Sequence, residues 1–430
     1  MAAGAFSTDE AYAAGLDEVD PLAGMRGRFH LPRGAIYLLG NSLGLMTAAE
    51  ASVLRVLDEW KAMGIGGWLG GDPPWFWLAE RIGEAAAPLV GAASDEVVCT
   101  GTTTFDIHSL AGTFYRPGGG RRKIIASAAD FPTDVYALES WVLLHGGRRE
   151  QDLVLIEPGG DGFVDEERII AAMTDEAALV HLPSVFYRSG QLLDIERLAA
   201  AARERGIPIG FDCSHSAGIV PHRLSEWGVD FAMWCGYKYL CGGPGAPAFL
   251  YVNRRHFGRV PALAGWFGYV KERQFDLLPE FEHALGAGGW QVSSPGILGA
   301  AAVQGALGVI CEAGVEAIRE KSLRLTTYLI ELADAFLAVE PYRFRVATPR
   351  EPGRRGGHVA LARDEDALRI KEALVDRGVF VDFRPPDLIR LAPSPLHTSF
   401  AEVRHVVRQI MDIIDTRAYE RVSRKRKPIS

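Results

Sequence analysis

One lysine of the chain lies in surroundings that suit covalent chemistry. Lys238 belongs to the run Trp234–Leu240, among tryptophan, tyrosine and leucine, and is followed by the small-residue loop Gly242–Gly245. Glycine lets the backbone approach a ligand closely. An apolar setting disfavours the ammonium form of a lysine, which suits attack on an aldehyde. A lone lysine after a strand is more often an ordinary surface residue, so a second chemical group is needed to indicate a site.

A carboxylate provides this second group. Asp212 closes the apolar run Ile209–Asp212, one strand–helix–strand unit before Lys238, and His215 follows directly. In a parallel sheet, both Asp212 and Lys238 would lie at one edge. Pyridoxal-5′-phosphate (PLP) requires such a pair, a lysine for its aldehyde and a carboxylate for its ring nitrogen. The alternatives are a helix N-cap for Asp212 and a satisfied polar core residue for His215.

A phosphate group is best held by hydroxyls and backbone N–H groups at the start of a helix. The run Thr100–Thr104 supplies both, directly after an apolar run that is typical of a strand. The chain has no G-x-x-x-x-G-K-[ST] motif, and Gly118–Gly120 is followed by arginine. The sequence therefore favours a phosphate site at Thr100–Thr104 and excludes a P-loop.

The elements that would position these residues alternate along the chain. Strands are predicted at 96–100, 123–126, 153–157, 179–182, 207–212, 231–234 and 248–252, with helices at 133–145, 166–173 and 195–205. Strands that alternate with helices predict an α/β fold with a mostly parallel sheet covered on both faces.

Further elements flank this region. A helix is predicted at 48–63, and a loop rich in Gly, Pro and Trp at 66–77. One long helical stretch at about 298–339 is predicted to lead to a smaller α/β unit, with strands at 358–362, 379–383 and 389–391 and helices at 365–377 and 399–415. We therefore predict an N-terminal arm (1–47), a large domain (48–310), a small C-terminal domain (311–418) and a basic tail (419–430).

Composition excludes several classes of function. The net charge of -8 gives no basic footprint for nucleic acid, and the basic cluster Arg424–Lys427 is interpreted as a solvated tail. The five cysteines form no C-x-x-C pair and the eleven histidines no H-x-x-x-H spacing, so neither a disulfide framework nor a metal site is predicted. No apolar stretch reaches the ~18–20 residues of a membrane helix, and the acidic N-terminal region is not typical of a signal peptide. We expect a cytoplasmic protein that binds neither membrane nor nucleic acid.

Short motifs occur in one order across nearly the whole chain. They are Leu39–Gly44, Thr103–His108, Asp130–Asp134, Tyr187–Gly190, Gly210–His215, Trp227–Phe231, Tyr237–Leu240, Gly265–Gly268 and Ile389–Leu396. With this order and spacing, the chain resembles the kynureninase family of fold-type-I, aminotransferase class V-like PLP enzymes. The resemblance implies a large PLP-binding domain, a smaller C-terminal α/β domain and a homodimer with the site at its interface.

The resemblance also implies roles for the matching residues. Lys238 would carry the cofactor, Asp212 would pair with its ring nitrogen, and Arg390 would clamp the substrate α-carboxylate as a planar bidentate donor. Phe131 would stack on the ring and Tyr187 would assist acid–base steps. The remaining residues implied around the cofactor, some from across the dimer interface, are Asp134, His215, Ser294 and, near the phosphate, Thr103, Thr104, Tyr237 and Trp266. Taken alone, Arg390 could also be an exposed strand residue, although its neighbours are apolar.

The family hydrolyses the Cβ–Cγ bond of L-kynurenine or 3-hydroxykynurenine to an anthranilate and L-alanine. This chain departs from the family pattern at the aryl end of the substrate. Trp68 stands where a histidine is common, and Ser293 and Ser294 stand where many members have Ser-Asn; Phe267 is also expected in this pocket. These changes predict a preference for a ring-substituted kynurenine, such as a 3-hydroxy or alkylated form. Pro183 stands where a hydroxyl residue is often found, so no cofactor role is carried over to it.

Two other functions remain open from the sequence. A cysteine desulfurase or aminotransferase would share the lysine and carboxylate, but a desulfurase needs a thiol on a mobile loop and Cys311 falls in a predicted helix. A non-catalytic PLP-fold binding protein is less consistent with a complete set of chemical residues. The sequence also leaves open whether the reaction serves tryptophan catabolism through the kynurenine pathway or a specialised pathway to a modified anthranilate.

Overall fold

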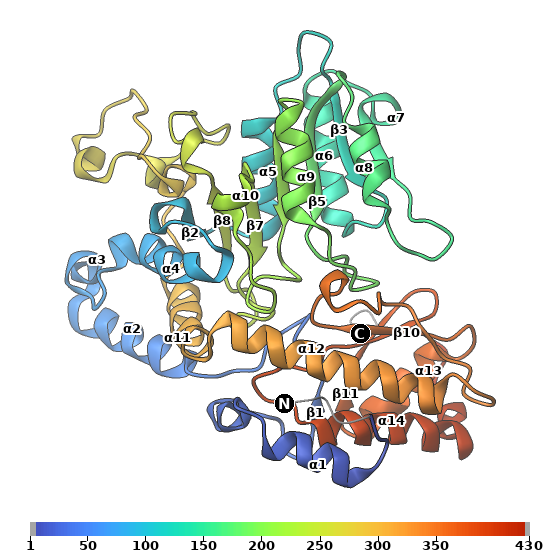
Figure 1. The fold of residues 1–430 in the computed structure, drawn as a ribbon. Helices are drawn as coiled ribbons and strands as arrows, with labels where there is room; N and C mark the ends of the chain where they lie inside the picture. The colour runs from blue at the N-terminus through green and yellow to red at the C-terminus, as the bar shows by residue number, and fades with distance from the viewer. Residues whose placement is uncertain (1–5, 426–430) are drawn as a thin grey trace.

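A seven-stranded sheet forms the centre of the larger unit (Figure 1) in the computed structural model, which describes residues 6–425. The strand order is β2-β8-β7-β6-β5-β3-β4. The strands are β2 (Val97–Thr100), β3 (Lys123–Ser127), β4 (Leu153–Ile156), β5 (Ala177–Pro183), β6 (Ile209–Asp212), β7 (Phe231–Cys235) and β8 (Ala248–Val252). Strands β4, β3, β5, β6 and β7 pair in parallel, and β8 is antiparallel to both of its neighbours. The predicted mostly parallel sheet is confirmed, with all seven strands within about two residues of their predicted ends.

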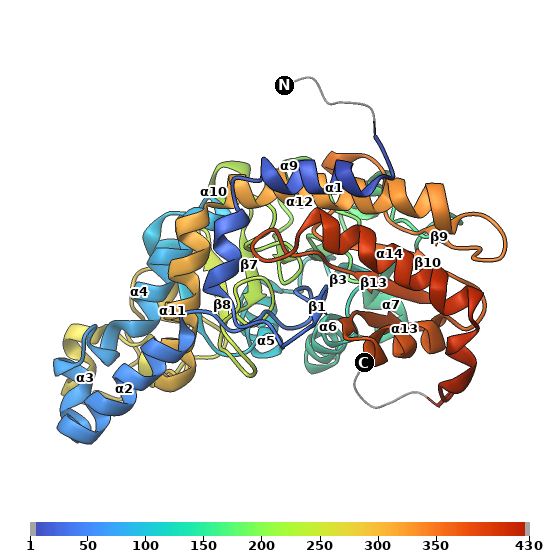
Figure 2. The same cartoon turned by 90° about the horizontal axis from the view of Figure 1, so that it is seen from below.

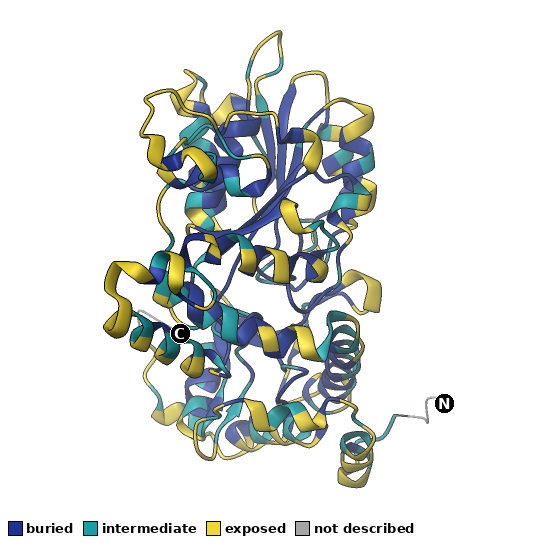
Figure 3. Ribbon diagram, turned by 90° about the vertical axis from the view of Figure 1, so that its left-hand side faces the viewer, coloured by how far each residue is buried: buried dark blue, intermediate teal, exposed yellow. Residues whose placement is uncertain are grey.

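Side chains that alternate along the strands build a hydrophobic core on each face of this sheet. Ile124 belongs to the core under α5 (Thr103–Phe114) and α6 (Pro132–Leu144), whereas the next residue, Ile125, belongs to the core under α8 (Glu166–Ala172) and α9 (Ile195–Glu204). This follows from the period of two in a strand. Figure 3 shows the result, with buried strands between helices whose outer surfaces are exposed.

A second, smaller sheet forms the C-terminal unit and has its own core. Its order is β12-β13-β10-β9, with all neighbouring pairs antiparallel. Its elements are β9 (Arg345–Val346), β10 (Val359–Ala362), α13 (Ala367–Asp376), β12 (Asp382–Arg384), β13 (Leu388–Leu391) and α14 (Phe400–Asp415). The predicted single strand at 379–383 is divided, because β11 (Val379–Phe380) instead pairs with β1 (Ile36–Tyr37).

The start of the chain is attached to this C-terminal unit. Helix α1 (Glu10–Glu18) lies beside α14, as seen from below in Figure 2. The carboxylate of Asp17 accepts hydrogen bonds from the backbone N–H groups of Phe400 and Ala401. An acidic side chain at a helix N-terminus satisfies free N–H groups and complements the helix dipole.

The prediction of one long helical stretch between the two units is wrong in one respect. The stretch consists of two helices, α11 (Ile297–Ala313) and α12 (Val315–Leu332), which meet at an angle of 76°. Gly314 joins them with a positive φ of 77°, a conformation that favours glycine and ends a helix. No single helix within residues 6–425 is long and apolar enough to cross a membrane; α11 and α12 pass that test only as a bent pair, and both contribute buried side chains.

The predicted basic tail is described only in part. Arg424 lies 4.0 Å from the carboxylate of Asp366, at the start of α13. Arg426 and Lys427 of this cluster lie outside the described residues.

The break between α11 and α12 gives a stability prediction. Gly314→Ala should lower the free energy of unfolding by about 1 kcal/mol, because alanine is strained at positive φ although space is free around the new Cβ. Gly308→Ala is the matched control, since Gly308 is an exposed residue inside α11 with equally free space and should tolerate or gain from alanine. Thermal unfolding of both variants measures the difference, and equal midpoints would contradict this account of the break.

Candidate active site

Lys238 lies just beyond the end of β7 and is half-buried. Its Nζ is 3.0 Å from Nε2 of His215. The segment around Gly44 packs directly on this loop, where the Gly44 N–H donates to the carbonyl of Tyr237. A Cβ at Gly44 would stand 2.3 Å from the Lys238 carbonyl, so only glycine permits this approach. The glycine of the Leu39–Gly44 motif therefore fixes the position of the lysine backbone.

Asp212 ends the neighbouring strand β6, which pairs in parallel with β7 so that Asp212 lies opposite Met233. The carboxylate is buried, and its Oδ1 accepts a hydrogen bond of 2.7 Å from the N–H of Ser214. This local bond fixes the orientation of the carboxyl group in the turn after β6. Asp212 is thus oriented by a turn rather than serving as an N-cap of one of the assigned helices.

His215 follows in the same turn, with its side chain buried beside Lys238. Burial, and then the nearby positive charges of Lys238 and Arg390, hold the pKa of His215 well below its usual value. The ring is therefore neutral, with Nε2 at hydrogen-bond distance from Lys238 Nζ, while Nδ1 has no hydrogen-bond partner. A neutral histidine next to the lysine can hold a proton only transiently, as a relay requires.

Three carboxyl groups share this chamber. Asp130, just before α6, and Asp134, in its first turn, are buried, and burial raises the pKa of both, with the charge of Asp212 adding to the effect. Oδ2 of Asp134 and Oδ1 of Asp130 have no hydrogen-bond partner. Because buried like charges repel, the charged forms of Asp130 and Asp134 are disfavoured beside Asp212. Asp130 belongs to the Asp130–Asp134 motif, but no role was predicted for it.

The aromatic residue predicted to stack on the cofactor is open to solvent. Phe131 stands at the N-cap of α6 with 48 % of its surface exposed, and its ring lies edge-on to Tyr187 at 5.3 Å.

The start of α5 lies close to the start of α6, where Thr104 Oγ1 is 2.8 Å from Thr133 Oγ1. Gly101, with φ of 60°, makes the turn from β2 into α5. Thr103 and Thr104 thus offer hydroxyls and helix N–H groups for a phosphate.

These residues fit PLP. Asp212 would hold the ring nitrogen, Phe131 would stack on the ring, and the hydroxyls at the start of α5 would hold the phosphate. The orphaned atoms Asp134 Oδ2 and His215 Nδ1 supply polar partners that the protein itself does not use. Tyr237 stands next to Lys238, and burial raises the pKa of its hydroxyl, so this group acts as a neutral donor.

Arg390 comes from β13 of the smaller unit and is fully buried, with 1 % exposure. It is therefore not the exposed strand residue that the sequence allowed as an alternative. Its Nε donates to Oδ1 of Asp382 at 2.7 Å, one Nη donates to Oδ2 of the same carboxylate, and the other Nη donates to the carbonyl of Tyr187. Asp382, on the adjacent strand β12, was missed because nothing in its sequence context distinguishes it from a surface residue.

Two buried histidines near the site were also missed. His181 on β5 lies beside Gly210 on β6, below Asp212, and burial lowers its pKa to about 4. His358 precedes β10, and its ring lies 5.9 Å from that of His215. Neither histidine has a hydrogen-bond partner on either ring nitrogen. Each is isolated in the sequence, and single histidines in apolar runs give no signal of function.

The residues predicted for the aryl pocket form a separate group. The ring of Trp68, on α3 (Gly67–Gly70), lies 5.8 Å from Phe267. Trp266 is 44 % exposed, and Ser293 and Ser294 are exposed on the loop before α11. Within residues 6–425, no hydrogen bond or ring contact joins this group to Lys238. One chain brings together Lys238, Asp212, His215, Phe131, Tyr187 and Arg390, but it does not complete the aryl pocket around them.

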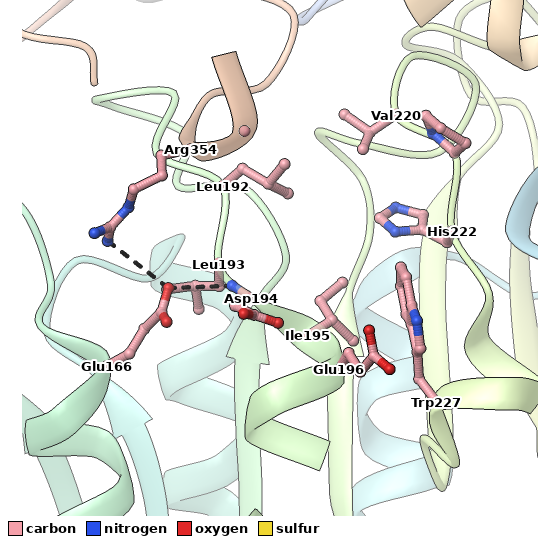
Figure 4. A pocket seen from close by; sticks show the side chains of 12 residues that line it. Glu166, Leu192, Leu193, Asp194, Ile195, Glu196, Val220, His222, Trp227 and Arg354 are labelled. Atoms are coloured by element: carbon pink, nitrogen blue, oxygen red, sulfur yellow. Dashed lines mark hydrogen bonds and ion pairs between the residues drawn. The ribbon is translucent and has the colours of Figure 1, made fainter. Parts of the chain in front are cut away.

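A cavity of about 410 Å³ lies elsewhere, at the start of α9 (Figure 4). Leu192 and Ile195 face the rings of His222 and Trp227 across it, and Arg354 approaches Glu166 at its edge. None of the predicted site residues lines this cavity. It is therefore distinct from the Lys238 site.

Comparison with known proteins agrees with this geometry. The chain matches the family model "Aminotransferase class-V" over residues 78–357 and "Kynureninase C-terminal domain" over residues 318–410. It is 47 % identical to a kynureninase of Geobacillus thermodenitrificans and 45 % identical to one of Bacillus anthracis, over 97 % of this chain and of each relative.

Solved structures show the same fold at lower identity. A cysteine desulfurase from Thermococcus onnurineus aligns with a TM-score of 0.75 and 18 % identity, covering 91 % of this chain and 98 % of the desulfurase. The cystine C–S lyase C-DES aligns with a TM-score of 0.76 and 17 % identity, covering 88 % of this chain and 98 % of the lyase. These likenesses show the fold alone, whereas the relatives that match at 45–47 % identity show the family. The chain belongs to the kynureninase family of PLP-dependent enzymes.

Proposed function

We propose that the protein hydrolyses the Cβ–Cγ bond of an L-kynurenine, with one water consumed, to give an anthranilate and L-alanine. The observation that carries this proposal is the 3.0 Å contact between Lys238 Nζ and His215 Nε2, in a chamber that also holds Asp212 and Arg390. The relatives named kynureninase support the substrate class. A desulfurase is not favoured, since Cys311 lies within α11 and the cysteines at 99, 213, 235 and 241 are all buried.

The chain's own residues support each stage of this reaction. Arg390 binds the substrate α-carboxylate and so orients the Cα–H bond toward Lys238. Lys238, once replaced by the substrate amine, is a free base that removes the α-proton, and His215 accepts a hydrogen bond from its Nζ. When bound, PLP supplies the electron sink for this step, and Asp212 supports that role by holding the ring nitrogen protonated. Tyr187, whose ring lies edge-on to the exposed ring of Phe131, would assist the acid–base steps as a hydroxyl donor.

We further propose that the substrate ring carries a substituent. Trp68 presents an indole edge-on to Trp75 and close to Phe267, which forms an apolar wall. Ser293 and Ser294 present small hydroxyls on the opposite loop. A larger wall on one side and a smaller side chain on the other would suit a 3-hydroxy or alkylated aryl ring.

This pocket is incomplete in one chain, so we propose a homodimer in which it closes across the interface. Trp266, Ser293 and Ser294 are exposed, and Trp60, Ile65 and Leu69 on the neighbouring α2–α3 region (α2, Ala49–Met63) are exposed apolar residues. Exposed apolar residues of this size normally mark an interface. A second copy of the chain would cover them and complete the aryl pocket.

Substrate preference tests the ring assignment. We expect kcat/KM for 3-hydroxykynurenine or a ring-methylated kynurenine to exceed that for kynurenine about tenfold, the scale of one well-fitted group in a pocket. Trp68→His with Ser294→Asn should reduce this ratio toward unity, because both changes restore the common family pattern. Trp77→His, a change at a half-exposed tryptophan outside the pocket, should leave the ratio unchanged. A preference of the unmodified enzyme for unsubstituted kynurenine would refute the ring assignment.

Mixed dimers test the shared pocket. Lys238→Ala removes the reacting amine, and Ser294→Arg would fill the aryl pocket, so each variant alone should be inactive. If Ser294 serves the partner's lysine, a random mixture should recover about a quarter of the wild-type activity, because half of the dimers then contain one intact site.

A matched mixture checks this interpretation. Lys238→Ala mixed with Arg390→Ala should recover no activity, since Arg390 contacts the Tyr187 carbonyl of the chain that carries Lys238. Absence of recovery in the Ser294→Arg mixture would show that the pocket is built within one chain.

A further inference from the structure

His358 is a buried histidine for which the reaction described above has no use. It directly precedes β10, and its side chain has no exposed surface. In the small sheet, Ala360 pairs with Arg390, and Arg390 pairs with Asp382. His358 lies two residues before Ala360, so its side chain lies on the same face of this sheet as Arg390 and Asp382. The small side chain of Ala360 leaves room for these larger groups.

The other side of His358 faces the lysine. Its ring lies 5.9 Å from the ring of His215, whose Nε2 is 3.0 Å from Lys238 Nζ. Gly190, at the end of the Tyr187–Gly190 motif, closes over the histidine. A Cβ at Gly190 would stand 2.8 Å from the His358 carbonyl and 3.3 Å from its Nε2. His358 is therefore fixed between the arginine of one unit and the lysine of the other.

The ring carries hydrogen-bonding capacity that the protein does not use. Neither Nδ1 nor Nε2 has a hydrogen-bond partner. Burial, and then the positive charge of Arg390, lowers the pKa of His358 to about 3. The backbone of Arg188 raises this pKa slightly, but it forms no hydrogen bond of good geometry with the ring. The ring is neutral and offers one N–H donor and one acceptor. A buried polar group without a partner is costly, which indicates that a ligand completes it.

Arg390 does not use all of its N–H groups within the protein, and a second donor could bind the same ligand. Its guanidinium has five N–H groups, and three hydrogen bonds, two to Asp382 and one to the Tyr187 carbonyl, leave two for a ligand. The carboxylate of Asp382 is shared between Arg390 and Arg384, whose Nη lies 3.0 Å from it. An α-carboxylate that binds here therefore meets a cationic group with two N–H donors left, and a further N–H would strengthen its binding.

We propose that His358 is a second binding residue for the amino-acid end of the substrate, where its ring N–H donates to the α-carboxylate held by Arg390. This inference rests on the proposed function for the identity of the substrate. The hydrogen bond itself would form with any α-amino acid in this position, including the product L-alanine.

Binding of L-alanine to the holoenzyme tests the proposal, with L-alaninamide, which lacks the carboxylate, as the comparison ligand. Absorbance of the bound cofactor reports both titrations. His358→Leu should weaken L-alanine binding about 10- to 100-fold, the loss of one hydrogen bond to a charged group, and leave alaninamide within about threefold. His358→Gln keeps an N–H donor and should bind L-alanine within about threefold of wild type.

Two controls keep the result specific. His222→Leu removes a buried imidazole that hydrogen-bonds to Ser216 and lines the separate cavity of Figure 4, and it should leave L-alanine binding unchanged. Thermal midpoints of all variants show whether folding is intact. The proposal is overturned if His358→Leu weakens both ligands equally or neither, or if His358→Gln behaves like His358→Leu. Failure of the wild type to cleave any kynurenine would refute the proposed function but not this hydrogen bond.

Discussion

Burial of ionisable groups at the carboxyl ends of β6 and β7 is the constraint on which this site depends. Two adjacent parallel strands place Asp212 and Lys238 at one edge of the sheet, and the turn after β6 adds His215. Asp130 lies before α6 and Asp134 in its first turn, and burial raises the pKa of both. A chamber that buries these groups beside Asp212 and His215 is costly while their polar atoms lack partners. A cationic ring nitrogen held by Asp212 would reduce that cost.

The second constraint is that Arg390, the proposed substrate clamp, belongs to a different unit from the lysine. Arg390 and Asp382 lie on neighbouring strands of the small sheet, yet Arg390 donates to the carbonyl of Tyr187 in the large unit. A charged arginine can be buried at this junction only because Asp382 pairs with it. The same junction holds His358 and Gly190 in contact. A few buried polar side chains therefore join the packing between the two units to the proposed substrate site.

The sequence predicted the large sheet well because each strand is a short apolar run between helical patterns. It also predicted that Lys238 and Asp212 share an edge, since one strand–helix–strand unit separates them. The break at Gly314 was missed because apolar residues continue through it, and a glycine within a helical pattern does not by itself reveal a bend of 76°. The division of the strand at 379–383 was missed because β11 pairs with the N-terminal β1, a contact that no local pattern encodes.

Within the site, the sequence indicated residues that lie in distinctive motifs and missed their partners. Asp382 contacts Arg390, and His358 lies near His215, only because the fold brings them together. The aryl pocket illustrates the same limit, because Trp68 and Phe267 are distant in sequence and meet only in the folded chain.

The attachment of the cofactor tests the central claim most directly. The protein is reconstituted with PLP, reduced with borohydride, digested and mapped by mass spectrometry. The account predicts a pyridoxyl group on the peptide that contains Lys238, and its loss in Lys238→Ala. A colourless protein without an adduct, or an adduct confined to another lysine, would contradict it.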